Sequence, residues 1–257
     1  MKLSDAIGNN SFLKVLIYGR SGAGKTVAST KFPLPIFIAD FDGKSVSAAN
    51  YWGANGKERL VQIDFETYLP SGPRGASKAY ALFVKKIEEY EAQVAQGKFT
   101  LGTFIIDSVT ALDDTMKLAM IQDNPGLKRA DTLTPTLQEY GFFNNHFKSL
   151  IRRVLALPCN VVVVAHDLME KDETSGIIST RIHITDKLAS WLPKMFGEVY
   201  YCHVTASKDG GQYEYKALTQ SSKYVTRTQI PGMPNVIPME YNYIKDLMSK
   251  QQTETKE

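Results

Sequence analysis

The chain has 257 residues, of which 43% are hydrophobic and 22% are charged, a composition that is ordinary for a soluble globular protein. This length suits one large α/β domain, and the formal net charge of +3 is compatible with a polyanionic partner without requiring one. The two cysteines have no metal-type spacing, which argues against a zinc site and against a disulfide framework.

The sequence has no segment that is typical of secretion or membrane insertion. The N-terminus reaches the acidic residue Asp5 without a continuous apolar core, and the longest aliphatic run, residues 161–165, is too short to span a bilayer. We therefore expect a cytoplasmic protein without a membrane partner. A single domain over residues 1–248 is the simplest organisation, and we expect the polar tail at 249–257 to be disordered.

Short apolar runs alternate with helical patterns in the first half of the chain. The predicted elements are, in order, a strand at 13–18, a helix at 24–31, strands at 36–39 and 60–63, a loop at 66–77, a helix at 79–97, a strand at 103–107 and a helix at 109–121. The loop is predicted from its proline and glycine residues, and the helix after it from the apolar residues on one face.

The second half begins in the same way and then changes its pattern. The predicted elements are a polar connection at 123–134, a helix capped by Thr134 and running from Pro135 to Leu157, a strand at 161–164, a mobile loop at 167–181, a helix at 186–196 that Pro193 interrupts, a hairpin of residues 197–206 and 212–218, a strand at 223–228 and a helix at 241–248.

This order of elements predicts an α/β fold. Strands that alternate with helices favour a mainly parallel sheet covered by helices on both faces, and the hairpin adds an antiparallel C-terminal extension. Ligands of such sheets bind at the carboxyl ends of the strands. Gly19–Thr26, Asp42, Asp107 and His166 all lie at the carboxyl ends of predicted strands, so we expect them to meet at one edge of the sheet.

A glycine-rich segment after the first strand fits the pattern G-x-x-x-x-G-K-[ST] in full: Gly19-Arg20-Ser21-Gly22-Ala23-Gly24-Lys25-Thr26. The glycines let successive backbone N–H groups face phosphate oxygens, and the helix that follows adds its positive end. Lys25 is expected to reach the β- and γ-phosphates, and the Thr26 hydroxyl is expected to bind magnesium. We therefore predict a P-loop NTPase that binds ATP with Mg²⁺. The expected nucleotide contacts are Gly19, Ser21, Gly22, Ala23, Gly24, Lys25, Thr26 and Val27.

Acidic residues follow two of the predicted strands. Asp107 ends the strand at 103–107 and is a candidate magnesium ligand, the alternative being an N-cap of the next helix, for which Ser108 is equally suited. Asp40 and Asp42 follow the strand at 36–39. Asp42 is a candidate catalytic residue that orients the attacking water or accepts its proton, the alternative being a tight turn over residues 40–43.

Three basic residues complete the candidate catalytic set. His166 follows the strand at 161–164, where it can sense the γ-phosphate, and the alternative is a surface histidine at the start of a loop. Lys223 and Arg227 lie four residues apart on a predicted strand and so on one face of it. They are candidates to supply positive charge to the γ-phosphate of a neighbouring subunit, and a solvated strand face is the alternative.

The order of these parts resembles the RecA-like core ATPases, and most of all the phage-encoded, RecA-like single-strand annealing proteins. The resemblance covers about residues 12–245. In that family a strand ending in Asp-x-Glu supplies the catalytic carboxylate, and Asp40-Phe41-Asp42 occupies the matching place with a shorter side chain. Asp107 matches the second acidic strand, and His166 matches the polar residue that couples nucleotide to DNA.

The resemblance also implies a nucleic-acid partner. The two DNA-binding loops of the family correspond to about 123–134 and 167–181, and their cations here are Lys128, Arg129, Lys171 and Arg181. Lys223 and Arg227 match the paired C-terminal cations of the family. The Phe-x-x-Ala segment that links many recombinase protomers is missing near the N-terminus, and the second loop carries acidic residues instead of aromatic ones.

These observations lead to one main hypothesis. We expect an ATP-hydrolysing homo-oligomer, either a ring or a filament, that binds single-stranded DNA and promotes annealing or homologous recombination in a phage-infected bacterial cell. A single-strand-binding protein is a further candidate partner. The alternatives are an AAA-type motor ATPase, which normally adds a helical lid domain, and a nucleotide or small-molecule kinase, which normally closes an arginine-rich lid.

Overall fold

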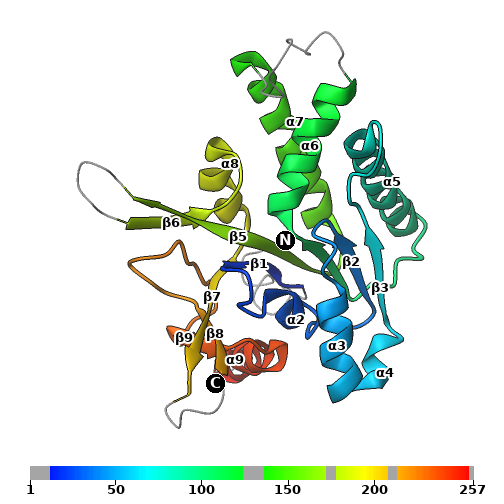
Figure 1. The fold of residues 1–257 in the computed structure, drawn as a ribbon. Coiled ribbons are helices and arrows are strands. Elements are labelled where there is room, and N and C mark those ends of the chain that lie inside the picture. Colours follow the sequence, from blue (N-terminus) through cyan, green and yellow to red (C-terminus); the bar gives the residue numbers. More distant parts are fainter. Residues whose placement is uncertain (1–11, 124–135, 172–177, 208–212, 255–257) are drawn as a thin grey trace.

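A mainly parallel β-sheet forms the centre of the computed structural model, which describes residues 12–123, 136–171, 178–207 and 213–254 (Figure 1). The strands of the described residues are β1 (Lys14–Gly19), β2 (Ile36–Asp40), β3 (Ile63–Thr67), β4 (Thr103–Asp107), β5 (Asn160–Lys171), β6 (Ile178–Ile182), β7 (Glu198–Ala206), β8 (Tyr213–Leu218) and β9 (Val236–Pro238). The helices are α2 (Lys25–Ser29), α3 (Val46–Asn55), α4 (Lys57–Leu60), α5 (Gly75–Ala95), α6 (Val109–Asp123), α7 (Leu137–Ala156), α8 (Asp186–Trp191), the 3₁₀ helix η2 (Leu192–Met195) and α9 (Tyr241–Glu254).

The strand order across the sheet is β3-β2-β4-β5-β1-β7-β8-β9, and β6 pairs with β5 outside this path. Neighbours from β3 to β7 are parallel, whereas β8 and β9 extend the sheet in antiparallel fashion. The predicted fold class is therefore confirmed. Because β1, β4 and β5 are adjacent and parallel, the segments that follow their carboxyl ends meet at one edge of the sheet.

Alternate residues of the central strands enter two hydrophobic cores, one on each face of the sheet. In β1, Leu16 and Tyr18 belong to the first core, whereas Val15 and Ile17 belong to the second. The helices α5, α6, α7 and α8 cover the first face, and α2 and α9 cover the second (Figure 1). The central strands are thus buried on both sides, which explains their continuous apolar runs.

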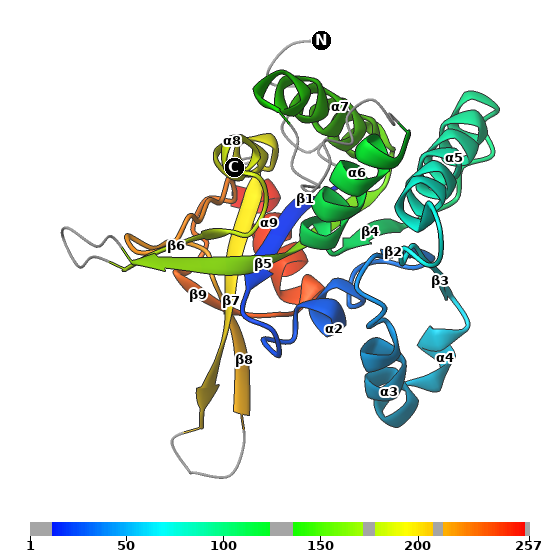
Figure 2. The same cartoon turned by 45° about the horizontal axis from the view of Figure 1, so that its top comes forward.

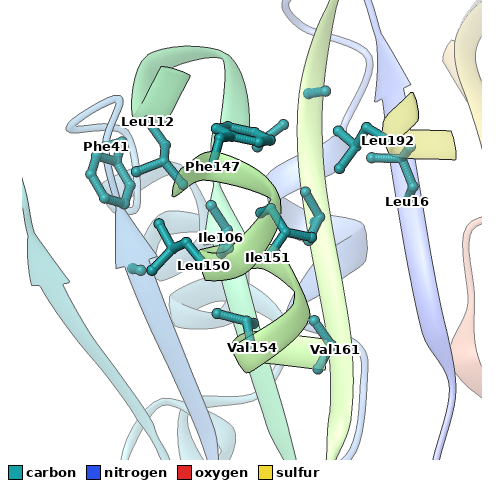
Figure 3. Close-up of a cluster of buried hydrophobic side chains, with 14 of the residues drawn as sticks. Leu16, Phe41, Ile106, Leu112, Phe147, Leu150, Ile151, Val154, Val161 and Leu192 are labelled. Atoms are coloured by element: carbon teal, nitrogen blue, oxygen red, sulfur yellow. The ribbon is translucent and has the colours of Figure 1, made fainter. Parts of the chain in front are cut away.

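Helix α7 packs across β4 and β5. Its buried side chains Phe147, Ile151 and Val154 recur at helical spacing and point toward Ile106 of β4 and Val161 of β5 (Figure 3). Burying a side chain of this size stabilises the fold by roughly 1.5–3 kcal/mol. The packing therefore keeps β4 and β5 in register, and with them the polar residues that follow the two strands.

The start of α7 differs from the prediction. The N-cap is Thr136, whose N–H donates to the Glu139 carboxylate in a capping box, and Thr134 and Pro135 lie outside the described residues. Both threonines have hydroxyl groups that can accept an N–H group of the first helical turn, but only Thr136 has a glutamate three residues later. The capping box therefore places the helix start.

Four short elements in the first and last thirds of the chain were misplaced or were not predicted. Residues 57–60 form the helix α4 instead of beginning a strand, and the edge strand β3 starts only at Ile63. Its sequence, Ile63-Asp64-Phe65-Glu66, alternates apolar and polar residues, and none of them is fully buried, which fits an edge strand. The helix α3 and the strand β9 have weak patterns, and neither was predicted.

The segment at 167–181 was predicted as a mobile loop, and this prediction is wrong for its described residues. Strand β5 continues to Lys171 and pairs in antiparallel fashion with β6, from Asp167 opposite Ile182 to Lys171 opposite Ile178. This ribbon projects from the sheet (Figure 2). A two-stranded ribbon has little core to fill, so its polar sequence gave no strand signal.

The C-terminal part also departs from prediction at two places. Residues 223–228 form no regular strand, because only Arg227 forms a single antiparallel bridge, with Val199. Helix α9 continues past Met248 to Glu254, so part of the predicted disordered tail is helical. No helix in the described ranges is both long and apolar enough to cross a membrane.

Candidate functional site

The P-loop connects the end of β1 to the start of α2. Gly19 and Gly24 have φ values of 147° and 76°, which glycine adopts readily and other residues rarely. A Cβ atom on Gly19 would lie 2.3 Å from the backbone oxygen of Cys202, and one on Gly24 would lie 2.7 Å from Cδ1 of Tyr215. The loop therefore requires glycine at both positions, for its backbone conformation and for the close approach of β7 and β8.

The side chain of Lys25, the first residue of α2, contacts the backbone at the start of the P-loop. Its side chain is nearly buried, and its ammonium donates hydrogen bonds of 2.8 Å each to the backbone oxygens of Gly19 and Arg20. Burial lowers the pKa of Lys25. A buried ammonium that is bonded only to neutral carbonyl groups is suited to an anionic partner, because a phosphate oxygen stabilises positive charge more strongly.

Thr26 and Asp107 form the second contact of the site. The Thr26 hydroxyl donates a hydrogen bond of 2.6 Å to Oδ2 of Asp107, which is only 3% exposed. Burial raises the pKa of Asp107 to about 6, and the negative charge of Asp42 adds to this effect, while the hydrogen bond from Thr26 opposes it. A buried carboxylate so disfavoured in its charged form gains from a cation beside it.

This donor set fits magnesium. The ion usually takes one or two protein oxygens and completes its shell with waters and substrate phosphates. Among the described residues no group of three or more His, Cys, Asp or Glu side chains is arranged to hold a metal. Thr26 and Asp107, next to a phosphate-binding loop, are therefore the residues that would hold Mg²⁺ together with a nucleotide.

The two aspartates after β2 have different surroundings. Both oxygens of the buried Asp40 carboxylate accept backbone N–H groups, four in all, with donor–acceptor distances of 2.7–3.3 Å. These N–H groups belong to Asp42, Gly43, Lys44 and Ser45. The turn role that the sequence allowed for this segment thus belongs to Asp40, which leaves the side chain of Asp42 free for other contacts.

Asp42 faces His166. Nε2 of His166 donates to Oδ2 of Asp42 at 2.8 Å, and the Ser108 hydroxyl donates to Oδ1 at 3.1 Å. Burial alone would raise the pKa of Asp42, but the hydrogen bond and charge of His166, with smaller contributions from Lys44 and Ser108, lower it overall. Asp42 is therefore ionised at neutral pH and can accept a hydrogen bond from a water molecule.

His166 lies where the core part of β5 ends. It is level with Gly19 of β1 in the parallel register, and its backbone N–H donates to the Thr110 hydroxyl at 3.0 Å. The same strand continues beyond it into the β5–β6 ribbon. His166 thus joins the carboxylate of Asp42 to a projecting part of the molecule, which the sequence alone did not indicate.

A cavity of about 620 Å³ brings most of these residues together. Of the predicted nucleotide contacts and catalytic residues, those on its wall are Ser21, Gly22, Ala23, Gly24, Lys25, Thr26, Val27, Asp42, Asp107 and His166. Gly19 does not line it and lies behind the loop at the end of β1. The sequence analysis missed two aromatic wall residues, Tyr51 of α3 and Tyr215 of β8. The only available signal for Tyr51 was its position nine residues after Asp42, in a helix that was not predicted.

The remaining candidates lie elsewhere. Lys223 and Arg227 are exposed and do not line this cavity, and the irregular backbone between them removes the predicted common strand face. Arg181 pairs with Glu170 at 2.7 Å and with Asp186 at 2.9 Å. Lys171 is exposed at the end of β5. Lys128 and Arg129 lie outside the described residues.

Comparison with known proteins assigns the chain to a family. The family model described as AAA domain matches residues 11–230, and the chain therefore belongs to that family. None of the curated proteins matches the chain. Among solved structures it is similar to the flagellar accessory protein FlaH from Methanocaldococcus jannaschii, with 11% identity and a TM-score of 0.44 over 91% of this chain and 88% of that one. It is also similar to the RadB recombinase, with 13% identity and a TM-score of 0.41 over 85% of this chain and 94% of that one.

Proposed function

From its membership of the AAA domain family and the geometry of its P-loop, we propose that this P-loop ATPase hydrolyses ATP with Mg²⁺ and couples hydrolysis to single-stranded DNA. In this proposal the protein acts as a homo-oligomer that promotes strand annealing or homologous recombination. The observation that carries the proposal is the 2.8 Å hydrogen bond between Asp42 and His166. It links the hydrolytic carboxylate to the strand that leaves the sheet as the β5–β6 ribbon.

In this proposal each group of cavity residues has a separate role in hydrolysis. The backbone N–H groups of the P-loop and the Lys25 ammonium bind the phosphates and stabilise the negative charge that develops on them. Thr26 and Asp107 would hold Mg²⁺, and the ion would supply positive charge that offsets the negative charge of the phosphates. Asp42 orients the attacking water and accepts its proton, and the hydrogen bond from His166 keeps its carboxylate in place.

The link to DNA runs through β5. A change in the hydrogen bond of His166 when the γ-phosphate is lost would displace the base of the β5–β6 ribbon, because the two belong to one continuous strand. Loss of the γ-phosphate would then change the position of the ribbon, which lies outside the cavity. Lys171, at the end of β5, is the described cation of this ribbon that remains available for a DNA phosphate.

Oligomer formation is part of the same proposal. Lys223 and Arg227 are exposed but do not line the cavity of their own chain. A role for them at a γ-phosphate therefore requires the cavity of a neighbouring protomer. This support is geometric, because in a monomer the two cations do not line the cavity in which the γ-phosphate would lie.

The alternatives receive less support from the described residues. A motor ATPase normally adds a helical lid, whereas here the residues after Gly197 form β7, β8 and β9 before the single helix α9. A kinase normally closes an arginine-rich lid, whereas Arg181 is bound to Glu170 and Asp186.

The test is steady-state ATP turnover with Mg²⁺, measured without nucleic acid and with oligo-dT, oligo-rU or duplex DNA. We expect turnover that oligo-dT stimulates and that Lys25→Ala abolishes, whereas Lys98→Ala, a change at an exposed lysine remote from the cavity, keeps wild-type behaviour. Wild-type turnover that no nucleic acid stimulates would remove the recombination half of the proposal. Absence of Mg-ATP binding by folded protein would remove all of it.

A further inference from the structure

A second groove lies on the outer side of the P-loop. It has a volume of about 650 Å³ and runs between residues 20–23 and the β7–β8 hairpin. Tyrosines are prominent on its wall: Tyr201, Tyr213, Tyr215 and Tyr224. None of the described residues that line it is acidic. The described residues that line the groove thus combine several tyrosines with no acidic side chain, a combination that the candidate loops at 123–134 and 167–181 do not have in sequence.

The tyrosines of β8 are presented to solvent. Tyr213 and Tyr215 are two residues apart on one strand and so lie on the same face, and they are 73% and 49% exposed. Neither ring is needed to fill a core. Deeper in the groove, Tyr224 stacks on Tyr201 with ring centres 3.7 Å apart and planes inclined by 10°. The groove therefore already contains one face-to-face ring pair and two further rings that are free to stack.

Positive charge accompanies these rings. Arg20 lines the groove, and its guanidinium contacts Sδ of Met169 at 3.1 Å but forms no salt bridge with the described residues. The ammonium of Lys223 lies 5.6 Å from the centre of the Tyr224 ring. The nearest acid of β8, Glu214, is on the opposite strand face and pairs with Lys216 at 2.5 Å. One carboxylate contacts a wall residue without itself lining the groove, because Oδ2 of Asp167 accepts a hydrogen bond of 3.1 Å from the Tyr201 hydroxyl. A polyanion that enters the groove therefore meets cations, with no acidic side chain among the described residues that line it.

We infer that this groove binds single-stranded nucleic acid, with unpaired bases stacked on the tyrosines and backbone phosphates near Arg20 and Lys223. Stacking platforms combined with cations are the general means by which proteins hold unpaired strands without reading their sequence. The inference rests on the proposed function and specifies its binding surface as the β7–β8 groove. Tyr215 also lines the nucleotide cavity, so an occupied groove shares a wall with the nucleotide.

The experiment is fluorescence anisotropy of a fluorescein-labelled oligo-dT with the full chain, Mg²⁺ and a non-hydrolysable ATP analogue. We expect Tyr213→Ala to weaken binding at least about fivefold, the lower end for loss of one stacking ring. Tyr213→Phe should bind like the wild type because it keeps the ring. The matched control is Phe65→Ala, which removes a ring that is 54% exposed on the far edge strand β3 and should leave affinity unchanged.

The outcomes separate this inference from the proposed function. If the wild type binds oligo-dT and Lys171→Ala weakens binding while Tyr213→Ala and Tyr224→Ala do not, the groove assignment is overturned and the proposed function stands. If the wild type binds no strand, the nucleic-acid half of the proposed function fails as well. Photocrosslinking of the unaltered protein to oligonucleotides carrying 5-iododeoxyuridine avoids any folding defect of the variants. Crosslinks at Tyr213 or Tyr224 support the groove, and crosslinks confined to residues 167–182 overturn it.

Discussion

Two hairpins project from the same sheet, and they differ in how they contact the nucleotide cavity (Figure 2). The β5–β6 hairpin grows out of a core strand, and its base holds Asp42 through His166. The β7–β8 hairpin reaches the P-loop from outside, where the ring of Tyr215 lies against Gly24.

The chemistry of the two hairpins is also different. In the first, Arg181 is paired with Glu170, whereas the second exposes tyrosine rings beside Arg20, which forms no salt bridge with the part of the chain that the structure describes. A contact with the candidate catalytic residues and a surface suited to a strand therefore need not belong to the same hairpin. We assign the first hairpin to sensing hydrolysis and the second to binding the strand. The predictions below test this division.

The largest effect is expected at Asp42, where the contact with the first hairpin begins. Asp42→Asn keeps the shape of the side chain but cannot accept a proton, so turnover should fall by about 10²-fold or more while nucleotide binding persists. Asp64→Asn, an exposed change on β3, is the control for turnover. Asp40→Asn should instead lower thermal stability, because its carboxylate accepts four backbone N–H groups. An Asp42→Asn enzyme with normal turnover would remove Asp42 from catalysis.

The next largest effect concerns Asp107, which lines the same cavity as His166 of the first hairpin and Tyr215 of the second. Its pKa is about 6 in the fold and 3.8 as the ordinary value, so its ionisation costs roughly 3 kcal/mol of folding stability once the pH exceeds both values. Because the carboxyl pKa is raised in the fold, the nucleotide-free protein loses this stability as the pH rises from about 4 through 6. Asp107→Asn should therefore melt at a higher temperature than the wild type at pH 7.5 without Mg²⁺.

The same residue gives the opposite result with ligand. Mg-nucleotide should stabilise the wild type at pH 7.5 much more than Asp107→Asn, and this gain should shrink below pH 6 as the carboxyl takes up its proton. Thermal denaturation at pH 5 and 7.5, with and without Mg²⁺ and an ATP analogue, measures both effects. Equal stabilisation of the two proteins by Mg-nucleotide would show that Asp107 does not hold the metal.

The site residues that could be predicted from the sequence are those that directly follow an apolar strand. The P-loop, Asp107 and His166 could be located because each directly follows an apolar strand, and parallel strands bring such positions to one edge. Asp40 and Asp42 could not be told apart, because both follow the same strand and only the direction of nearby N–H groups separates them. The direction of these N–H groups depends on the folded backbone and cannot be predicted from a sequence pattern.

The aromatic residues of the two cavities were out of reach for a different reason. Tyr51 belongs to α3, a helix with weak amphipathicity, and Tyr215 belongs to a hairpin whose alternation is as typical of core packing as of a binding surface. The extension of β5 past His166 was missed because a solvated ribbon has no core-facing period. Long-range contacts, not local pattern, decide these features.

A smaller effect is expected when the hydrogen bond between His166 and Asp42 is removed. His166→Ala removes a hydrogen bond to an ionised carboxylate, which is worth about 1.5–3 kcal/mol, so basal turnover should fall by about tenfold or more. The sharper expectation is that oligo-dT still binds but no longer stimulates turnover. His146→Ala, a change at an exposed histidine of α7, is the control. Stimulation that survives in His166→Ala would transfer the coupling to Tyr215 and the second hairpin.

The smallest effect is expected at Arg181, which the sequence presented as a DNA contact. In the fold its guanidinium is bound to Glu170 and Asp186, so a phosphate would have to displace two carboxylates. Arg181→Ala should therefore change oligo-dT affinity by less than about twofold, and exposed ion pairs of this kind contribute little to the melting temperature. Lys171→Ala, without a carboxylate partner among the described residues, tests the same hairpin at a cation that is available. A large loss of affinity in Arg181→Ala would mean that strand binding breaks the ion pairs, and the division between a sensing and a binding hairpin would then fail.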